Sequence, residues 1–249
     1  MNTKQLRQKI LDLAIRGKLI PQDPNDEPAS VLLERVRAEK ERLNSRRTKP
    51  FVPITESDIP FTVPKGWMWC RLSQIVQVIN GDRGKNYPSK EKLSKTGIPF
   101  VSASNISNGL VNSEDLLCMT EAQYNLLGNG KLQFDDIVFC IRGSLGKTGF
   151  FRFEKGAIAS SLVIVRTIFP DSVLRNYVFR YLTSGLLYDE ISKYDNGTAQ
   201  PNLAAKDFEN FLIPIPPLAE QSRIVDAVER LSSDVDTIEH MAKSLLGLI

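Results

Sequence analysis

The stretch Pro217-Leu-Ala-Glu-Gln-Ser-Arg-Ile-Val-Asp-Ala-Val-Glu-Arg-Leu-Ser-Ser-Asp-Val-Asp-Thr-Ile-Glu-His-Met-Ala-Lys-Ser-Leu-Leu-Gly-Leu-Ile249 carries the clearest pattern in the 249-residue sequence. Its apolar residues recur every four and three positions, which averages 3.5: Ile224, Val228, Leu231, Val235, Ile238, Ala242, Leu245 and Ile249. A 3.5-residue repeat is typical of a coiled-coil seam. The stretch therefore predicts a helix over 217–249, about 50 Å long at 1.5 Å per residue, that pairs with another helix.

An alternative is a terminal helix that packs on its own domain. The strict period argues against this, because such a helix usually keeps a period nearer 3.6. Residues 213–249 also carry more acidic than basic side chains. Phosphates would repel that charge, so we expect this helix to lie away from any nucleic acid.

Upstream, residues 51–216 alternate short apolar runs with turns rich in Gly, Asn and Ser. Runs that are bounded by such breakers predict strands, and they cover residues 75–79, 98–101, 137–141 and 157–165. Helical patterns cover 124–127 and 173–187. The segment is expected to be an α+β (mixed α/β) domain, and its strand order stays open.

The first fifty residues predict two helices and a linker. Leu6, Ile10 and Leu13 have helical spacing, and Gly17 stands where a helix commonly ends. A connector with three prolines precedes a second helix from about Pro28 to Leu43, and a basic stretch at 46–50 has the character of a linker. The predicted organisation is a helical hairpin and linker (1–50), a mixed domain (51–216) and a C-terminal coiled-coil helix (217–249).

Composition excludes several classes of protein. With 32 Lys+Arg, 29 Asp+Glu and 42% hydrophobic residues, the chain is neither a basic tail nor a disordered segment. Three cysteines without a CxxC pair and one histidine argue against a disulfide framework, a zinc site and a His-based triad, so no metal is expected. No apolar run reaches the length of a membrane span and the start is polar, which predicts a cytoplasmic chain without a membrane partner.

Two loops carry most of the candidate binding chemistry. Residues 80–95 place five basic side chains among two acids, with two glycines, Asn86 and Tyr87, which suits either contacts to DNA phosphates and base edges or a plain solvated loop. The other loop, 141–148, ends like a phosphate-binding P-loop, but Ile141 stands where that motif requires glycine. It remains either a Gly-rich contact to a DNA phosphate or a plain turn.

A smaller polar cluster is either a contact surface or a solvated loop. Its members are Ser102, Ser104, Asn105 and Asn108. No Asp-x-Lys or Glu-x-Lys occurs, so the usual two-metal nuclease pattern is missing. We therefore expect a chain without catalytic residues.

Three further stretches are distinctive: Leu11-Asp-Leu-Ala-Ile-Arg-Gly-Lys-Leu-Ile-Pro-Gln-Asp-Pro-Asn-Asp-Glu-Pro-Ala-Ser30, Val63-Pro-Lys-Gly-Trp-Met-Trp-Cys-Arg-Leu72, and Gly197-Thr-Ala-Gln-Pro-Asn-Leu203 continuing into Ile213-Pro-Ile-Pro-Pro-Leu-Ala-Glu-Gln-Ser-Arg-Ile-Val225. They resemble the specificity subunits of type I restriction-modification enzymes. The last of these is the most specific, and together they frame nearly the whole chain.

The resemblance implies a target-recognition domain followed by a spacer helix. It also implies a non-catalytic role: such subunits hold methyltransferase subunits, which bind S-adenosylmethionine, on double-stranded DNA, and a restriction (translocase) subunit is a further partner. This chain itself is expected to bind no cofactor. A full-length member has two recognition domains and two spacer helices, whereas this chain has one of each, so it resembles a half-subunit.

A half-subunit suffices if two copies pair through their C-terminal helices. Two recognition domains would then read a palindromic split site as a homodimer. The candidate dimer residues are Ile224, Val228, Leu231, Val235, Ile238 and Leu245. The candidate DNA contacts are Arg83, Lys85, Asn86, Tyr87, Lys90, Arg142, Ser144, Lys147, Thr198, Gln200 and Asn202; Asn202 is alternatively the N-cap of a following helix.

The sequence leaves several alternatives open. The chain is either a natural half gene or a truncated product, and it pairs either with itself or with another specificity chain. A different class of function is a protein-interaction module that dimerises through its coiled coil without binding DNA. A phosphate-ester enzyme that uses Lys147 is a remote third.

Overall fold

The computed structural model describes residues 2–43, 53–194, 202–245 and 247. The chain divides into two compact units. The terminal unit lies within residues 1–75, 169–189 and 212–249, and the central unit within 76–168 and 190–211. None of the helices in the described part of the chain has both the length and the hydropathy that a membrane span needs. The recognition-domain boundaries 51–216 remain a prediction.

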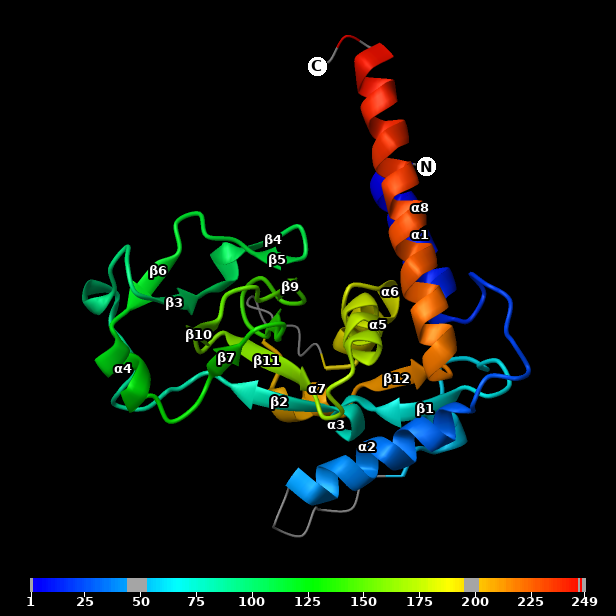
Figure 1. Ribbon diagram of the computed structural model, residues 1–249, viewed down its shortest axis with the longest axis horizontal. Coiled ribbons are helices and arrows are strands. Elements are labelled where there is room, and N and C mark those ends of the chain that lie inside the picture. The colour runs from blue at the N-terminus through cyan, green and yellow to red at the C-terminus, as the bar shows by residue number, and fades with distance from the viewer. Residues whose placement is uncertain (1, 44–52, 195–201, 246, 248–249) are drawn as a thin grey trace. The chain divides into compact units, whose positions relative to one another are not determined.

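The terminal unit is mainly helical (Figure 1). Its helices are α1 (Thr3–Ile15), α2 (Ala29–Leu43), the short α3 (Leu72–Ile75), α5 (Ser172–Leu182) and α8 (Leu218–Leu245), and α6 (Gly185–Ser192) begins in it. Two strands, β1 (Met68–Arg71) and β12 (Leu212–Ile215), pair antiparallel from opposite ends of the chain. This pairing brings the residues just after Trp67 next to those just before α8.

Both predicted N-terminal helices form, but their packing as a hairpin is not confirmed. Asn2 caps α1 through a hydrogen bond from the backbone N–H of Gln5, and Gly17 follows the helix with φ +66°. The main partners of α1 are α8 and α5, whereas α2 packs against α3. The apolar stripe of each helix is therefore covered by a different element. The expected linker at 46–50 lies outside the described residues.

The long C-terminal helix is present as α8, which begins one residue after Pro217. Over 28 residues it extends about 42 Å at 1.5 Å per residue. In Figure 1 it runs beside α1 and continues past the N-terminal end of that helix. Arg7 of α1 joins the two helices, since it donates to the carbonyl oxygen of Ser232 at 3.0 Å and pairs with Asp236 at 2.6 Å.

The apolar repeat of α8 divides into two halves with different surroundings. Ile224, Val228 and Val235 are buried within this chain, whose α5 and α1 pack on α8. Further along, Ile238 is 60% and Leu245 88% exposed. The expectation of one continuous seam for another chain is therefore wrong for the first half, because the chain's own helices cover it. Ile249 lies outside the described residues.

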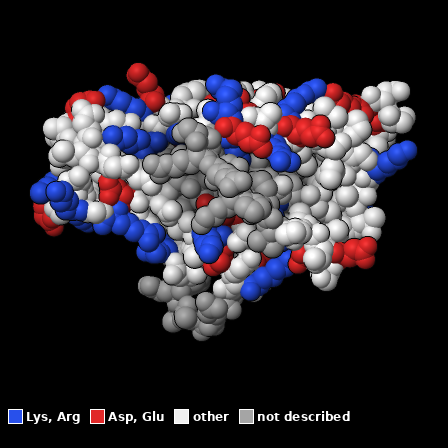
Figure 2. Space-filling model, turned by 90° about the horizontal axis from the view of Figure 1, so that it is seen from below, with Lys and Arg blue, Asp and Glu red and all other residues white. Residues whose placement is uncertain are grey.

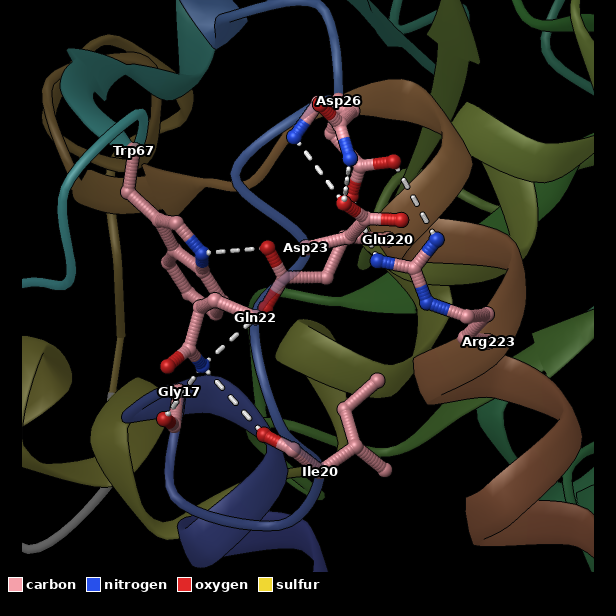
Figure 3. Close-up of polar contacts among 9 residues, drawn as sticks. Gly17, Ile20, Gln22, Asp23, Asp26, Trp67, Glu220 and Arg223 are labelled. Atoms are coloured by element: carbon pink, nitrogen blue, oxygen red, sulfur yellow. Dashed lines mark hydrogen bonds and ion pairs between the residues drawn. The ribbon is translucent and has the colours of Figure 1, made fainter.

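A buried carboxylate joins three distant stretches of the terminal unit (Figure 3). Glu220, in the first turn of α8, is 1% exposed. It accepts a hydrogen bond from Trp67 Nε1 at 2.9 Å and one from Gln22 Nε2 at 3.3 Å. Gln22 Nε2 also donates to the carbonyl oxygen of Gly17 at 2.9 Å. Burial raises the pKa of Glu220, and the two donors partly oppose that rise.

Gly17 lets these stretches approach closely. A Cβ on Gly17 would lie 2.4 Å from Cγ of Pro64 and 3.2 Å from Trp67, and its positive φ strains any other residue. One turn further along α8, Arg223 forms an ion pair with the buried side chain of Asp26. Two polar contacts, from Gln22 to Glu220 and from Asp26 to Arg223, thus hold the N-terminal connector against the start of α8.

The central unit holds two sheets. The first has the order β2-β11-β8-β9-β5-β4 and the second β6-β3-β10-β7. Their strands are β2 (Val76–Asn80), β3 (Ile98–Val101), β4 (Ile106–Ser107), β5 (Leu110–Val111), β6 (Leu117–Met119), β7 (Lys131–Gln133), β8 (Ile137–Cys140), β9 (Thr148–Phe150), β10 (Lys155–Ile158) and β11 (Leu162–Thr167). It also contains two short α-helices, α4 (Glu121–Leu126) and α7 (Ala205–Glu209).

The predicted strands at 75–79, 98–101 and 137–141 correspond to β2, β3 and β8. The single run predicted at 157–165 is wrong. It forms two strands, β10 and β11, which belong to different sheets and are separated by the turn 159–161. The helix predicted at 173–187 is likewise two helices, because α5 ends at Leu182 and α6 begins at Gly185. The mixed α+β class is confirmed.

An ion pair supports the centre of this unit. Asp136, 4% exposed, precedes β8 and accepts two hydrogen bonds from Arg166 of β11, at 2.8 and 2.6 Å. The same carboxylate accepts from the backbone N–H of Gln133 at 2.7 Å. A buried carboxylate with three donors is well satisfied, so the pair holds β11 against the β7–β8 turn.

Replacing Trp67 by Phe should destabilise the terminal unit, because the variant removes the donor that faces Glu220 and keeps most of the ring. We expect the free energy of unfolding to fall by about 1–3 kcal/mol at neutral pH. Urea denaturation measures it. Trp69→Phe is the control: Trp69 Nε1 donates to a backbone carbonyl at 3.3 Å and is less buried, so its loss should cost less. Equal losses would contradict the account.

Replacing Glu220 by Gln should change how stability depends on pH. The folded protein favours the protonated carboxyl group, so the wild-type chain loses stability as pH rises from the ordinary pKa of glutamate through the raised one. The Gln variant lacks this loss. Its stability relative to wild type should therefore increase between acidic and neutral pH in denaturation series. A difference that does not vary with pH would contradict a raised pKa.

Candidate nucleic-acid interface

The loop after β2 is organised by the carboxylate of Asp82. It accepts hydrogen bonds from the backbone N–H of Gly84 at 2.7 Å and of Gly128 at 2.8 Å. These donors lower the pKa of Asp82, because they stabilise its ionised form. Asn86 Nδ2 donates to the carbonyl oxygen of Leu126 at 2.8 Å. The predicted contact residue Asn86 thus fastens its own loop to the C-terminal end of α4.

The other candidates of this loop differ in their surroundings. Arg83 donates to the carbonyl oxygen of Ser160 at 3.3 Å, and the Tyr87 hydroxyl oxygen accepts from the backbone N–H of Ser160 at 3.5 Å. Tyr87 is half-buried, with its ring edge-on to Phe100 at a centroid distance of 5.6 Å. Lys85 and Lys90 are exposed, which leaves both cations accessible to a polyanion.

The loop at 141–148 is the turn of an antiparallel β-hairpin between β8 and β9. A P-loop leads from a strand into a helix, so this connection excludes that motif here. Gly143 and Gly146 have φ of +75° and +84°. The backbone N–H groups of Leu145, Gly146 and Lys147 donate within the loop or to Cys140. Those three groups are therefore not available to a phosphate.

The structure brings Arg142 and Asn202 together across 60 residues of sequence. Arg142 Nε donates to Asn202 Oδ1 at 2.9 Å, and the two backbones form an isolated β-bridge. Asn202 is not the N-cap of the following helix, because Ala204 holds that position before α7. Its side chain positions Arg142 instead. Both residues are exposed, and Ser144 lies exposed beside them in the loop.

Lys147 is less accessible than its loop neighbours. It is half-buried, and its Nζ donates to the carbonyl oxygen of Ala103 at 2.8 Å. The 141–148 loop is therefore fastened to the polar segment 102–105. Thr198 and Gln200 lie outside the described residues.

The turn 159–161 lies between the two basic loops. On one side, Ser160 contacts Arg83 and Tyr87. On the other, the carbonyl oxygen of Ser161 accepts from the backbone N–H of Ile141 at 2.9 Å. The candidates Arg83, Tyr87, Arg142 and Asn202 are thus grouped around one turn of the central unit. We call these loops, with the turn and segment 102–105, the recognition face.

Charge on the surface is mixed. In the view of Figure 2, Lys and Arg side chains are scattered and in several places lie beside Asp or Glu. Within the described residues, no cluster of three or more His, Cys, Asp or Glu side chains could hold a metal ion.

Two features of the face were not selected from sequence. Asp82 was not chosen, although its place between two glycines is typical of an Asx turn. Phe100 supports Tyr87 from another strand, a contact that no local pattern signals.

Comparisons with known proteins agree with this architecture. A family model described as "Type I restriction modification DNA specificity domain" matches residues 64–246. The EcoAI specificity subunit of Escherichia coli is 32% identical over 96% of this chain and 41% of its own length, and the EcoEI specificity subunit of the same species is 31% identical over 98% and 41%. The chain therefore spans about two-fifths of these relatives.

Among solved structures, the HsdS subunit from Thermoanaerobacter tengcongensis shares the fold, with a TM-score of 0.56 at 20% identity over 96% of this chain and 51% of that one. The family model covers most of the residues, and the curated relatives extend over nearly all of them. The chain belongs to the type I restriction-modification specificity subunit family.

Proposed function

We propose that this chain is a non-catalytic DNA-recognition subunit that reads one half of a bipartite site. The observation that carries the proposal is the grouping of Arg83, Tyr87, Arg142 and Asn202 around the turn 159–161 in a chain of this family. Side chains of these types make bidentate and stacking contacts to bases, and the exposed Lys85 and Lys90 supply phosphate contacts.

A subunit that recognises half of a site needs a second recognition subunit to bind a bipartite sequence. We infer that a second copy supplies it through the exposed end of α8, where Ile238 and Leu245 continue the apolar repeat beyond the part covered by α1 and α5 and the exposed Met241 flanks them. Two helices that pair there antiparallel would hold two recognition units in inverted orientation, which favours a palindromic target with an unread centre.

The same proposal assigns the partners. Methyltransferase subunits, which carry S-adenosylmethionine, would dock on this chain and act on the DNA that it selects, and a restriction subunit would join them. No cofactor is proposed for the chain itself. The DNA-binding role predicts a cytoplasmic complex.

Replacing Lys85 or Lys90 by Ala should weaken binding to all duplexes, because each variant removes a phosphate contact. Binding of the chain with its methyltransferase partner is measured across a salt series. The slope of log affinity against log salt should fall by about 1 for each variant. Lys9→Ala, an equal loss of charge on α1, should leave the slope unchanged. Association that is insensitive to salt would favour a protein-interaction module instead.

Replacing Ile238 and Leu245 together by Asp should abolish pairing through α8. Both side chains are exposed, so the fold should survive while two charges enter the seam. Sedimentation equilibrium of the purified chain should show dimers for wild type and monomers for the variant. Thr237→Asp, an exposed residue outside the repeat, is the matched control and should remain dimeric. A wild-type chain that stays monomeric would refute the homodimer.

A further inference from the structure

A cavity of about 450 Å³ opens in the central unit beside the recognition face. It lies between the loop 87–93, the end of β3 and the segment 102–105, and the lining residues include Tyr87, Lys90, Phe100, Ser104 and Asn105. Its volume falls within the range of roughly 300–1,000 Å³ that ligand pockets span.

The cavity lining includes Asn105, whose side-chain amide has a fixed orientation. Asn105 is only 6% exposed, and its Oδ1 accepts from the backbone N–H of Ser102 at 3.0 Å and from Ser102 Oγ at 2.9 Å. Because the backbone N–H can only donate, the amide cannot be flipped, and its Nδ2 is directed away from Ser102. In the described part of the chain, this Nδ2 has no acceptor within hydrogen-bond distance. Asn105 lines the cavity, so Nδ2 is left able to donate to a ligand there.

The neighbouring hydroxyl groups supply acceptors. Since Ser102 Oγ donates to Asn105, Ser104 Oγ is the donor in the 2.8 Å contact between the two serines. The lone pairs of Ser104 Oγ are then open to a donor from a ligand. Asp115, which also lines the cavity, adds carboxylate oxygens.

The cavity lining also includes two aromatic rings and a cation. Tyr87 and Phe100 meet edge to face, and their rings give a planar ligand a surface to pack on. Lys90 is exposed and lines the same cavity, so its ammonium group can reach an anion attached to that ligand. A planar polar heterocycle with an attached anion matches all of these groups.

We propose that this cavity binds one nucleobase together with its phosphate, with the base against Tyr87 and Phe100 and hydrogen-bonded to Asn105 Nδ2, and with the phosphate near Lys90. The inference rests on the proposed function and extends it, because it adds a base-binding pocket to the recognition face. The nucleobase comes either from an unpaired position in DNA or from a free nucleotide.

Saturation-transfer NMR on the full chain with each of the four deoxynucleoside monophosphates tests the pocket. At least one should receive saturation at its base protons. Asn105→Asp keeps an acceptor for both Ser102 bonds but replaces the donor, so binding should weaken by about tenfold. Ser104→Ala, at an exposed residue, removes the neighbouring acceptor without adding charge and should also weaken it. Asn108→Asp makes the same chemical change outside the cavity, at a left-handed position that Asp tolerates, and should bind like wild type.

A second experiment distinguishes DNA from a free nucleotide as the source of the nucleobase. A duplex with one bulged nucleotide should bind the wild-type chain more tightly than its fully paired counterpart if the base comes from DNA, and this preference should vanish in Asn105→Asp. Equal binding of both duplexes, with mononucleotide binding that depends on Asn105, assigns the pocket to a free nucleotide. The proposal is overturned if no nucleotide and no bulged duplex depends on Asn105 or Ser104. Salt-dependent binding to paired duplexes would in that case still support the proposed function, so the two failures are distinguishable.

Discussion

The carboxylate of Glu220 is the group on which the packing of the terminal unit depends. It is almost fully buried, and a buried carboxylate is tolerated only when donors surround it. Those donors, on Trp67 and Gln22, come from two other stretches of the chain. The three stretches that resemble the specificity-subunit family supply one residue each to this contact. Glu220, Trp67 and Gln22 therefore serve to hold the start of α8 in place, which is a structural role.

In the central unit, the positions of the candidate contact residues depend on the turn 159–161. Because β10 and β11 belong to different sheets, the chain has to change sheets within these few residues. The residues around the turn are closely packed. A Cβ on Gly81 would lie only 2.8 Å from the carbonyl oxygen of Ala159. Its backbone groups then contact both basic loops, so the positions of Arg83 and Arg142 depend on one short segment.

Local patterns predicted most of the elements and few of their contacts. The strands at β3 and β8 were predictable because apolar, β-branched runs end at breakers. The run at 157–165 was misread because apolar character alone does not show where a strand turns into another sheet. In α8 the same repeat contains Val228, buried by the chain's own helices, and Ile238, exposed. Spacing gives the face of a helix but not the identity of its partner.

In the candidate site, too, local patterns predicted residues better than they predicted the contacts between them. Charge and loop composition selected Arg83 and Arg142, and Asn202 came from a separate polar set near residue 200. The structure groups the three, but the pairing of Arg142 with Asn202 spans 60 residues and no local signal announces it. Asn202 was expected as a helix cap because Asn favours that position, whereas the arginine competes for its oxygen. Only the structure identifies Asn105 Nδ2 as a donor for a ligand, because it shows that Asn105 Oδ1 already accepts two hydrogen bonds from Ser102.

The most direct test of the central claim is the selection of random duplexes by this chain in complex with its methyltransferase partner. Two copies of the chain that are paired through α8 should enrich a sequence made of two inverted copies of one short motif at a constant separation. Selection of a single continuous motif, or of no motif at all, would contradict the view that two identical recognition faces are held at a fixed distance.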